Sequence, residues 1–225
     1  MTTKGSVELS PKLTDSKKEE RRLQILNAAK KVFAAKGYGA ATLKDIIEET
    51  DMSRGWIYLY FQTKDEIFEA LLDNQDAEHE RHLAELIESK SSIWEVVAVL
   101  YIQQLQELCR SPNGGLIPAF YEYFLIGWRE KSRRELLLKR YENGIARFSE
   151  LLQIGVERGE FSPIMDIVDI ARLAASYQEG IMTHSITIGI EKANARMQFE
   201  ALFEYLKTLL RPVSDYKPSR REEIE

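Results

Sequence analysis

TLKDIIEETDMSRGWIYLYFQTK, residues 42–64, is the stretch that decides the fold of this 225-residue chain. Thr42 followed by Asp45 is a typical helix start, because the side-chain oxygen accepts a hydrogen bond from an otherwise unpaired backbone N–H. Residues 43–47 then place three apolar side chains on one face of the helix. The pair Asp51-Met52 interrupts this pattern, so we expect the first short helix to end there.

A second short helix is predicted to begin at Ser53, with Ile57 and Phe61 one turn apart on its buried side. Two short helices joined by a tight turn form a helix-turn-helix, whose second helix can lie in the major groove of DNA. Similar helix pairs occur in all-α proteins that bind no DNA, so the exposed side chains decide the interpretation. The residues predicted to face outward are Arg54, Gly55, Trp56, Tyr58 and Tyr60.

This outward face favours nucleic acid, because an aromatic and cationic surface is costly to leave uncovered. Arginine binds guanine edges or phosphate, and tyrosine hydroxyls donate to phosphate oxygens. Lys64 follows one turn later, where it could reach a phosphate. For Trp56 a role as a hydrophobic brace within the protein stays open. The alternative for the whole module is binding to another protein rather than to DNA.

Charge is distributed unevenly along the chain. The formal net charge is −5, yet residues 17–64 carry +4 and residues 65–225 carry −9. A basic end on an acidic body is typical of a protein that presents one end to a polyanion. No apolar run reaches the roughly 18 residues of a membrane span. Cys109 is the only cysteine, which excludes an intrachain disulfide and favours a cytoplasmic protein with Cys109 buried on a helix.

The remaining pattern is helical, which predicts an all-α fold with four parts. These are a flexible arm at 1–15, a three-helix DNA-binding domain at 16–68, a larger helical domain at 69–211 and a tail at 212–225. Gly37 is expected to end the first helix in a left-handed conformation. The helix from about 63 to 87 has a polar middle at 73–82, as expected of a helix that bridges two domains.

The basic run and two histidines of the larger half are interpreted as solvated surface rather than as sites of chemistry. The basic run at 131–140 is expected to face solvent, as are His79 and His82, which lack further metal ligands nearby in the sequence. The chain offers three histidines, one cysteine and no glycine-rich phosphate loop. We therefore predict that the protein is not an enzyme and needs no cofactor.

The run RLQILNAAKKVFAAKGYGAATLKDIIEETDMSRGWIYLYFQTKDEIF resembles the N-terminal DNA-binding domain of the TetR family of bacterial transcriptional regulators. The matching features are ILNAA, Phe33 with Gly37 and Tyr38, Thr42, and the spacing from Ser53 to Lys64. The chain departs from the family at its turn, Thr50-Asp51-Met52, and at Trp56, where a small or polar residue is commoner. The resemblance implies DNA contacts by Thr42, Lys44, Ser53, Arg54, Gly55, Trp56, Tyr58, Tyr60 and Lys64, with Tyr38 a packing residue.

The larger domain is predicted to bind a small molecule and to dimerise. Aromatic side chains and a few polar groups gather in its helices, as in pockets for apolar or planar ligands, although each aromatic could equally fill a helical core. The predicted pocket residues are Trp94, Tyr101, Gln104, Phe120, Tyr123, Phe124, Trp128, Tyr177, Gln178 and His184. The resemblance implies that the last two helices pair with their copies, and the residues expected there are Ala174, Tyr177, Ile181, Phe199, Leu202, Phe203 and Leu206.

Together these features predict a ligand-responsive transcriptional regulator of repressor type. It would bind a palindromic operator as a homodimer and be released by a hydrophobic or aromatic small molecule.

Overall fold

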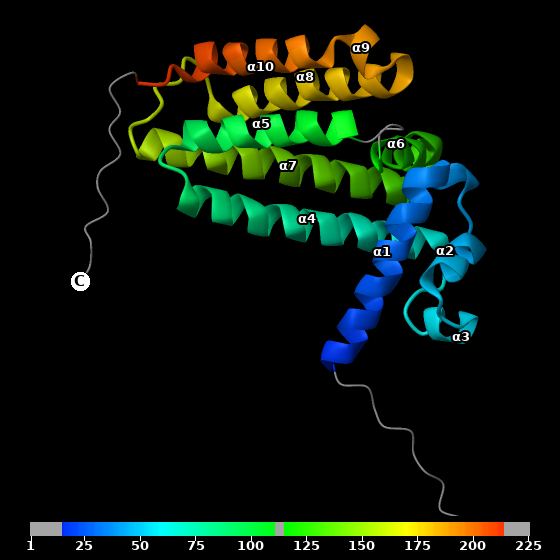
Figure 1. Ribbon diagram of the computed structural model, residues 1–225. Coiled ribbons are helices and arrows are strands. Elements are labelled where there is room, and N and C mark those ends of the chain that lie inside the picture. Colours follow the sequence, from blue (N-terminus) through cyan, green and yellow to red (C-terminus); the bar gives the residue numbers. More distant parts are fainter. Residues whose placement is uncertain (1–14, 111–114, 214–225) are drawn as a thin grey trace, which may run out of the picture.

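The computed structural model describes residues 15–110 and 115–213 (Figure 1). The predicted arm and tail lie almost wholly outside these ranges. Within them the chain is helical, and its only bridge of β type is an isolated pair between Phe161 and Pro212. The all-α prediction is confirmed. No helix in these ranges is long and apolar enough to cross a membrane.

The N-terminal unit contains α1 (Asp15–Ala40), α2 (Leu43–Thr50) and α3 (Arg54–Ile57). Gly37 has φ 75° and ψ 173°, so the regular helix ends there as predicted, and the chain turns sharply towards α2. Ile57 and Phe61 are buried under α1, as expected from their spacing. The second helix of the pair is only four residues long, because a turn replaces the helix at 58–60.

Helix α4 (Lys64–Ser89) connects this unit to the rest of the molecule. Thr63 caps it by accepting from the N–H of Glu66 at 3.1 Å. Its first turns bury Phe68 and Leu71 in the N-terminal core, and Leu86 near its other end lies in the core of the larger half. The predicted bridging helix is therefore present, with its apolar residues at the two ends.

The larger half stacks long helices in layers, with α4 on one side and α8 with α10 on the other (Figure 1). Its helices are α5 (Ile93–Arg110), α7 (Lys131–Glu157), α8 (Ile167–Ile188), the short α9 (Ile190–Ala193) and α10 (Ala195–Leu210). Their facing sides form one hydrophobic core that includes Val97, Leu152, Ile181 and Leu202. Cys109 is exposed near the end of α5, so the prediction that it is buried is wrong.

Helix α6 (Ile117–Ile126), followed by a single 3-10 turn η1 (Gly127–Arg129), packs against the N-terminal unit rather than into the larger core. Its Ala119, Tyr123 and Phe124 complete the core beneath α1. The carboxylate of Glu122 accepts from the N–H of Gly39 at 2.7 Å, just beyond the bend at Gly37. A three-helix unit of this size is marginal alone, and α6 together with α4 supplies the missing apolar cover.

The basic run at 131–140 does not form a fully solvated face. Arg133 and Arg140 have side chains only 12% and 14% exposed, and both point from α7 to carboxylates on α4. Arg147, one further heptad along, does the same. We call these three residues the arginine ladder. Because residues seven apart share a helix face, the ladder fixes α7 along the polar middle of α4. Its ion pairs are Arg133–Asp65, Arg140–Asp73, Arg140–Asp76, Arg147–Asp76 and Arg147–Glu80.

Candidate nucleic-acid interface

The start of α2 is closed by a reciprocal capping box. Thr42 Oγ1 accepts from the N–H of Asp45 at 3.2 Å, and the N–H of Thr42 donates to Asp45 Oδ2 at 2.9 Å. Lys36 reaches the other oxygen of the same carboxylate at 2.7 Å. Hydrogen bonds from Lys36 and Thr42 lower the pKa of Asp45 to about 2. The Thr42 backbone N–H and hydroxyl, expected at a phosphate, are thus both bonded to Asp45 in the free protein.

The turn between α2 and α3 is stabilised by hydrogen bonds within the turn and by one from α1. Asp51 adopts a left-handed conformation with φ 54°, a region that aspartate tolerates better than most residues. Thr50 is buried, and its hydroxyl bridges the C=O of Ile47 and the N–H of Met52. Gln24 of α1 donates to the Thr50 carbonyl at 3.3 Å. The unusual turn sequence therefore forms an ordered connection that sets the direction of α3.

The outward side of α3 is open. Ser53, Arg54 and Gly55 are exposed, and Trp56 is 42% exposed. A Cβ added to Gly55 would meet nothing within 4 Å, so the backbone here can be approached closely. Sequence reasoning missed Leu59, which is 74% exposed beyond the end of α3. Its position in an apolar-looking run gave no sign that the helix would end early and turn it outward.

The side chain of Arg54 packs against that of Tyr58. Its guanidinium donates to the Tyr58 hydroxyl at 3.2 Å and lies 5.4 Å from the ring centroid. A cation stacked on an aromatic ring loses little conformational freedom when it binds a further partner. Tyr58 and Tyr60 are half-buried, and Tyr60 packs against the N-terminal core. Of the two tyrosines, Tyr58 is thus the one joined to the open face.

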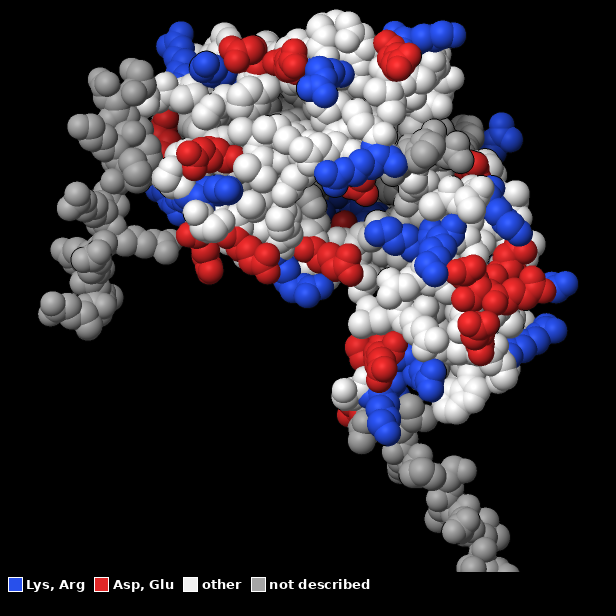
Figure 2. Space-filling view, viewed as in Figure 1, with Lys and Arg blue, Asp and Glu red and all other residues white. Residues whose placement is uncertain are grey.

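The charge of the N-terminal unit is more balanced at close range than its sum indicates. Figure 2 shows acidic and basic side chains side by side on this unit. Lys44, predicted to contact phosphate, is exposed and pairs with Glu48 at 3.5 Å. Such exposed pairs are weak, so these lysines remain available to a stronger anion. The local pairs are Lys18–Asp15, Arg22–Glu19, Lys31–Glu49, Lys36–Asp45 and Lys44–Glu48.

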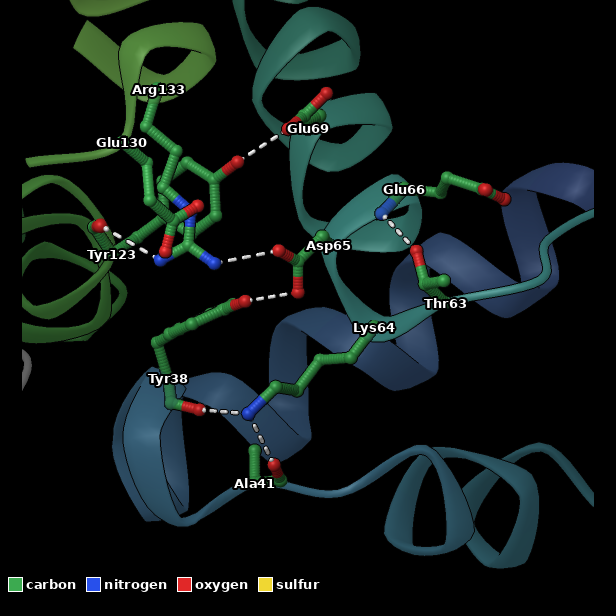
Figure 3. Close-up of polar contacts among 10 residues, drawn as sticks. All are labelled: Tyr38, Ala41, Thr63, Lys64, Asp65, Glu66, Glu69, Tyr123, Glu130 and Arg133. Carbon is green, nitrogen blue, oxygen red and sulfur yellow. Dashed lines mark hydrogen bonds and ion pairs between the residues drawn. The ribbon is translucent and has the colours of Figure 1, made fainter. Parts of the chain in front are cut away.

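Lys64 is bonded within the protein, contrary to its expected exposure to a phosphate (Figure 3). Its ammonium donates to the carbonyls of Tyr38 and Ala41 at 2.8 and 2.9 Å, and lies 4.3 Å from the Tyr38 ring centroid. These carbonyls follow the bend at the end of α1 and have no helical partner. Lys64 therefore joins the start of α4 to the end of α1, and its first role is structural.

A polar cluster lies where α1, α4, α6 and α7 meet (Figure 3). Asp65 accepts from the Tyr38 hydroxyl and from Arg133, the latter at 2.7 Å. The Arg133 guanidinium also lies 4.5 Å from the Tyr123 ring centroid, and the Tyr123 hydroxyl donates to Glu69. Burial, reinforced by the adjacent carboxylates, raises the pKa of both tyrosines. The cluster ties the N-terminal unit to the body through uncharged tyrosines and one arginine.

A cavity of about 610 Å³ opens between α4, α5, α7 and α8. Tyr101, Gln104 and Gln178 line it, as predicted from the sequence. His79 and His82 also line it, so they face this cavity and not only solvent. Burial, followed by the nearby Arg147, lowers the pKa of His79, which keeps that ring neutral at neutral pH.

Known proteins are similar in sequence to this chain over nearly its whole length. The chain matches a family model described as bacterial regulatory proteins, tetR family, over residues 25–71. A second model, described as tetracyclin repressor-like, C-terminal domain, matches residues 98–196. The chain is 37% identical over 202 residues to an uncharacterized HTH-type transcriptional regulator, YfiR of Bacillus subtilis, covering 90% of this chain and 98% of that protein. The chain belongs to the TetR family of transcriptional regulators.

Solved TetR-family structures have the same fold. A TetR transcription regulator from Haloarcula marismortui aligns with a TM-score of 0.72 at 17% identity, covering 85% of this chain and 99% of that one. A TetR-family regulator from Cytophaga hutchinsonii aligns with a TM-score of 0.67 at 20% identity, covering 89% and 98%. TetR-family members are DNA-binding regulators, usually repressors, and are not enzymes, so the predictions of family and of a non-enzymatic protein are confirmed.

Most aromatic residues predicted for a TetR-type ligand pocket lie elsewhere. Phe120, Tyr123 and Phe124 pack against the N-terminal core, and Trp94 stacks on Phe203 with ring centroids 4.4 Å apart. These rings are used for packing because each has apolar partners from another helix. The remaining three predicted pocket residues are exposed and do not line the cavity, namely Trp128, Tyr177 and His184. Cavity residues that the sequence did not single out include Tyr141, Arg147, Phe148, Glu107 and Glu179.

The residues predicted to form a TetR-type dimer interface are mostly internal to one chain. Ala174, Ile181, Phe199, Leu202 and Leu206 are each no more than 3% exposed in the protomer, and Phe203 is half-buried against Trp94. They hold α8 and α10 to the rest of the body. Only Tyr177, 39% exposed, projects outward. The outer side of these two helices instead exposes Leu173, Tyr177, Ile188, Met197 and Tyr205.

Proposed function

We propose that this TetR-family protein is a homodimeric repressor that binds a palindromic operator through α3 and releases it when a small molecule enters the body. The observation that carries the proposal is the open face of α3, where Arg54 is held on Tyr58 and Gly55 leaves the backbone accessible. A helix presenting such residues fits the major groove, with arginine reading guanine edges. Lys44 and Ser53, both exposed, are placed to contact phosphate beside it.

Gel-shift titrations against DNA flanking the gene of this protein test the proposal. Affinity should fall steeply as salt rises, because phosphate neutralisation releases counterions. Substituting Tyr58 by Phe removes one donor to phosphate and should weaken operator and unrelated DNA alike. If the protein shifts no DNA but retains a protein partner through the same face, the alternative of an interaction module is correct. Since DNA binding places the protein beside the chromosome, we also propose a cytoplasmic location.

We propose that α8 and α10 pair with their copies in a second chain. They form the outer layer of the body, on the side opposite α4 (Figure 1). Tyr205 and Met197, 42% and 49% exposed, lie on α10, and Leu173 on α8 is 39% exposed. Apolar side chains this exposed on adjacent helices are typical of a protein interface. Twofold symmetry would then set two α3 helices about one DNA turn apart.

Light scattering on the purified protein tests this interface. Tyr205→Glu should convert the dimer to monomer, because a carboxylate would be buried against its own copy in a twofold contact. Leu138→Glu is the matched control, since Leu138 is 56% exposed on α7 and belongs neither to α8 or α10 nor to the cavity lining. A monomeric wild-type protein, or a dimer that survives Tyr205→Glu unchanged, would contradict the proposed pairing.

We propose that α4 couples the cavity to α3. Arg147 lines the cavity and binds Glu80 of α4 at 2.8 Å, while Asp65 at the other end of α4 binds Tyr38 and Arg133. A molecule that displaces the cavity end of α4 would therefore change the tilt of the N-terminal unit. Release then follows by a population shift, in which the ligand favours the arrangement that does not fit the operator. The measure of this is a rise in operator dissociation constant on adding effector, at constant salt.

A further inference from the structure

The cavity between α4, α5, α7 and α8 is large enough for a drug-sized molecule. Its volume of about 610 Å³ lies within the usual range for such sites. Apolar side chains form part of its wall, among them Leu100 and Leu151. The chemistry of its occupant depends on the charged groups in the rest of the wall, so each of these is considered in turn.

The positive charges of the wall are already balanced. Arg147 binds Glu80 at 2.8 Å and lies 3.7 Å from Asp76, and its side chain is 25% exposed. An anionic ligand would have to compete with two carboxylates for this guanidinium. His79 has a lowered pKa and is neutral at neutral pH, and His82 is hydrogen-bonded to Gln103 at 2.9 Å. The wall therefore offers little to an anion.

The negative charges of the wall are not balanced in this way. Glu107 of α5 and Glu179 of α8 line the cavity from two different helices. Neither carboxylate has an ion-pair partner within 4.0 Å among residues 15–110 and 115–213. Glu179 also lies near the half-buried Tyr121, whose pKa is raised first by burial and then by this carboxylate. Charges of one sign in a recessed site attract the opposite sign.

Aromatic rings accompany these carboxylates. Tyr101, Tyr141 and Phe148 line the same cavity from α5 and α7. A ring face attracts an organic cation within about 6 Å, and does so more strongly when water is excluded. The rings also provide apolar area for the body of the ligand. Two unpaired carboxylates combined with aromatic and aliphatic walls complement a molecule that is both apolar and positively charged.

We propose that the effector of this regulator is a hydrophobic organic cation, bound in this cavity with Glu107 and Glu179 as its counter-charges. The inference rests on the proposed function, because it assigns a chemical class to the effector site of that function. It also narrows the sequence-based expectation of a hydrophobic or aromatic ligand by adding a charge. Neutral aromatic molecules should bind more weakly than cations of equal size, and anions more weakly still.

Tetraphenylphosphonium and tetraphenylborate are suitable probes, because they have nearly the same shape and opposite charge. Isothermal titration calorimetry of the full-length protein should show the cation binding at least tenfold more tightly. Glu107→Gln and Glu179→Gln should each weaken the cation about five- to tenfold, and tenfold corresponds to about 1.4 kcal/mol. Glu150→Gln is the matched control, since Glu150 is exposed on α7 and outside the cavity lining.

Equal or tighter binding of the borate, no binding of the phosphonium, or full affinity in both glutamine variants would overturn the inference. Both glutamates are exposed, so the variants should fold, and circular dichroism verifies this. Operator binding by the ligand-free protein is measured separately. If DNA binding holds while the cation preference fails, only this inference is lost. If the cation binds while no DNA does, the cavity assignment stands and the proposed regulatory function fails.

Discussion

Arg133 is the residue through which the polar cluster can be tested most sharply. Its side chain is 12% exposed, donates to Asp65 at 2.7 Å and lies 3.2 Å from Glu130. Its guanidinium also lies over the ring of Tyr123. Arg133→Met retains most of the apolar stem and removes the charge. The substitution should therefore report on the charge and its hydrogen bonds rather than on lost volume.

The expected loss is about 2–3 kcal/mol of unfolding free energy. A hydrogen bond between charged groups contributes about 1.5–3 kcal/mol and a cation–π contact about 1 kcal/mol. The side chain of Asp65 is 42% exposed, so water can partly rehydrate it, which limits the penalty. For a chain of this length each kcal/mol shifts Tm by roughly 2–4 °C. Thermal unfolding followed by circular dichroism should thus show a fall in Tm of about 4–12 °C.

Arg134→Met is the control, because Arg134 is the exposed neighbour on the same helix and should change stability by less than about 0.5 kcal/mol. Both variants are compared at one protomer concentration, since dimerisation also affects Tm. A double-mutant cycle with Asp65→Asn should give a coupling of about 1 kcal/mol or more. Equal Tm values for the two arginine variants, or a coupling near zero, would refute the view that this ion pair holds the N-terminal unit to the body.

Three further outcomes are expected. Hydrogen bonds from Lys36 and Thr42 depress the pKa of Asp45 to about 2. Its ionised carboxylate therefore stabilises the fold above pH 4, and this stabilisation is lost between pH 4 and 2. An NMR titration that gives Asp45 an ordinary carboxyl pKa would contradict this. Gly37→Ala should lower the free energy of unfolding by about 2–4 kcal/mol, because φ is 75° and the new Cβ would lie 2.5 Å from Glu122. Gly144→Ala, with open space around the new Cβ, should leave it unchanged or raise it. Urea unfolding measures both. Arg54→Ala should relax base preference in a binding-site selection while leaving the fold intact; an unchanged motif would exclude Arg54 from base reading.

The N-terminal unit could be predicted well because its signals are local. Thr42 with Asp45 and Thr63 with Glu66 are caps formed within one turn, and Gly37 adopts the positive φ that its position indicated. The burial of Ile57 in α3 and of Phe61 just beyond it follows from their spacing alone. The predicted length of the second helix was wrong, because a turn at 58–60 takes the place of helix and exposes Leu59. Propensity gives little indication of where a short helix ends.

The pocket was harder to predict because a ring gives the same sequence signal whether it lines a cavity or fills a core. Phe120 and Tyr123 pack under α1, more than 80 residues away in sequence. Only the topology decides this. A usable signal was nevertheless present in the arginine ladder, whose members at 133, 140 and 147 recur every seven residues and so share a face. Matched with the acidic middle of α4, that spacing indicates two helices lying side by side.

The proposed dimer surface shows a similar limit. The most apolar stripes of α8 and α10 contain Ile181 and Leu202, and both are buried in the protomer. A helix that packs on two sides uses its strongest stripe for its own core. The weaker, mixed stripe containing Tyr177 and Tyr205 is left outside. Hydrophobic periodicity alone therefore identifies the residues of the protomer core and not those of an interface between protomers.

The central claim is that paired α3 helices read DNA, and selection from a random duplex library tests it most directly. The account predicts that the wild-type protein enriches an inverted repeat with half-sites about one helical turn apart. It also predicts that Arg54→Ala loses preference at one position in each half-site. Enrichment of no sequence, or of a single unrepeated half-site by a protein that is dimeric in the same buffer, would contradict the account.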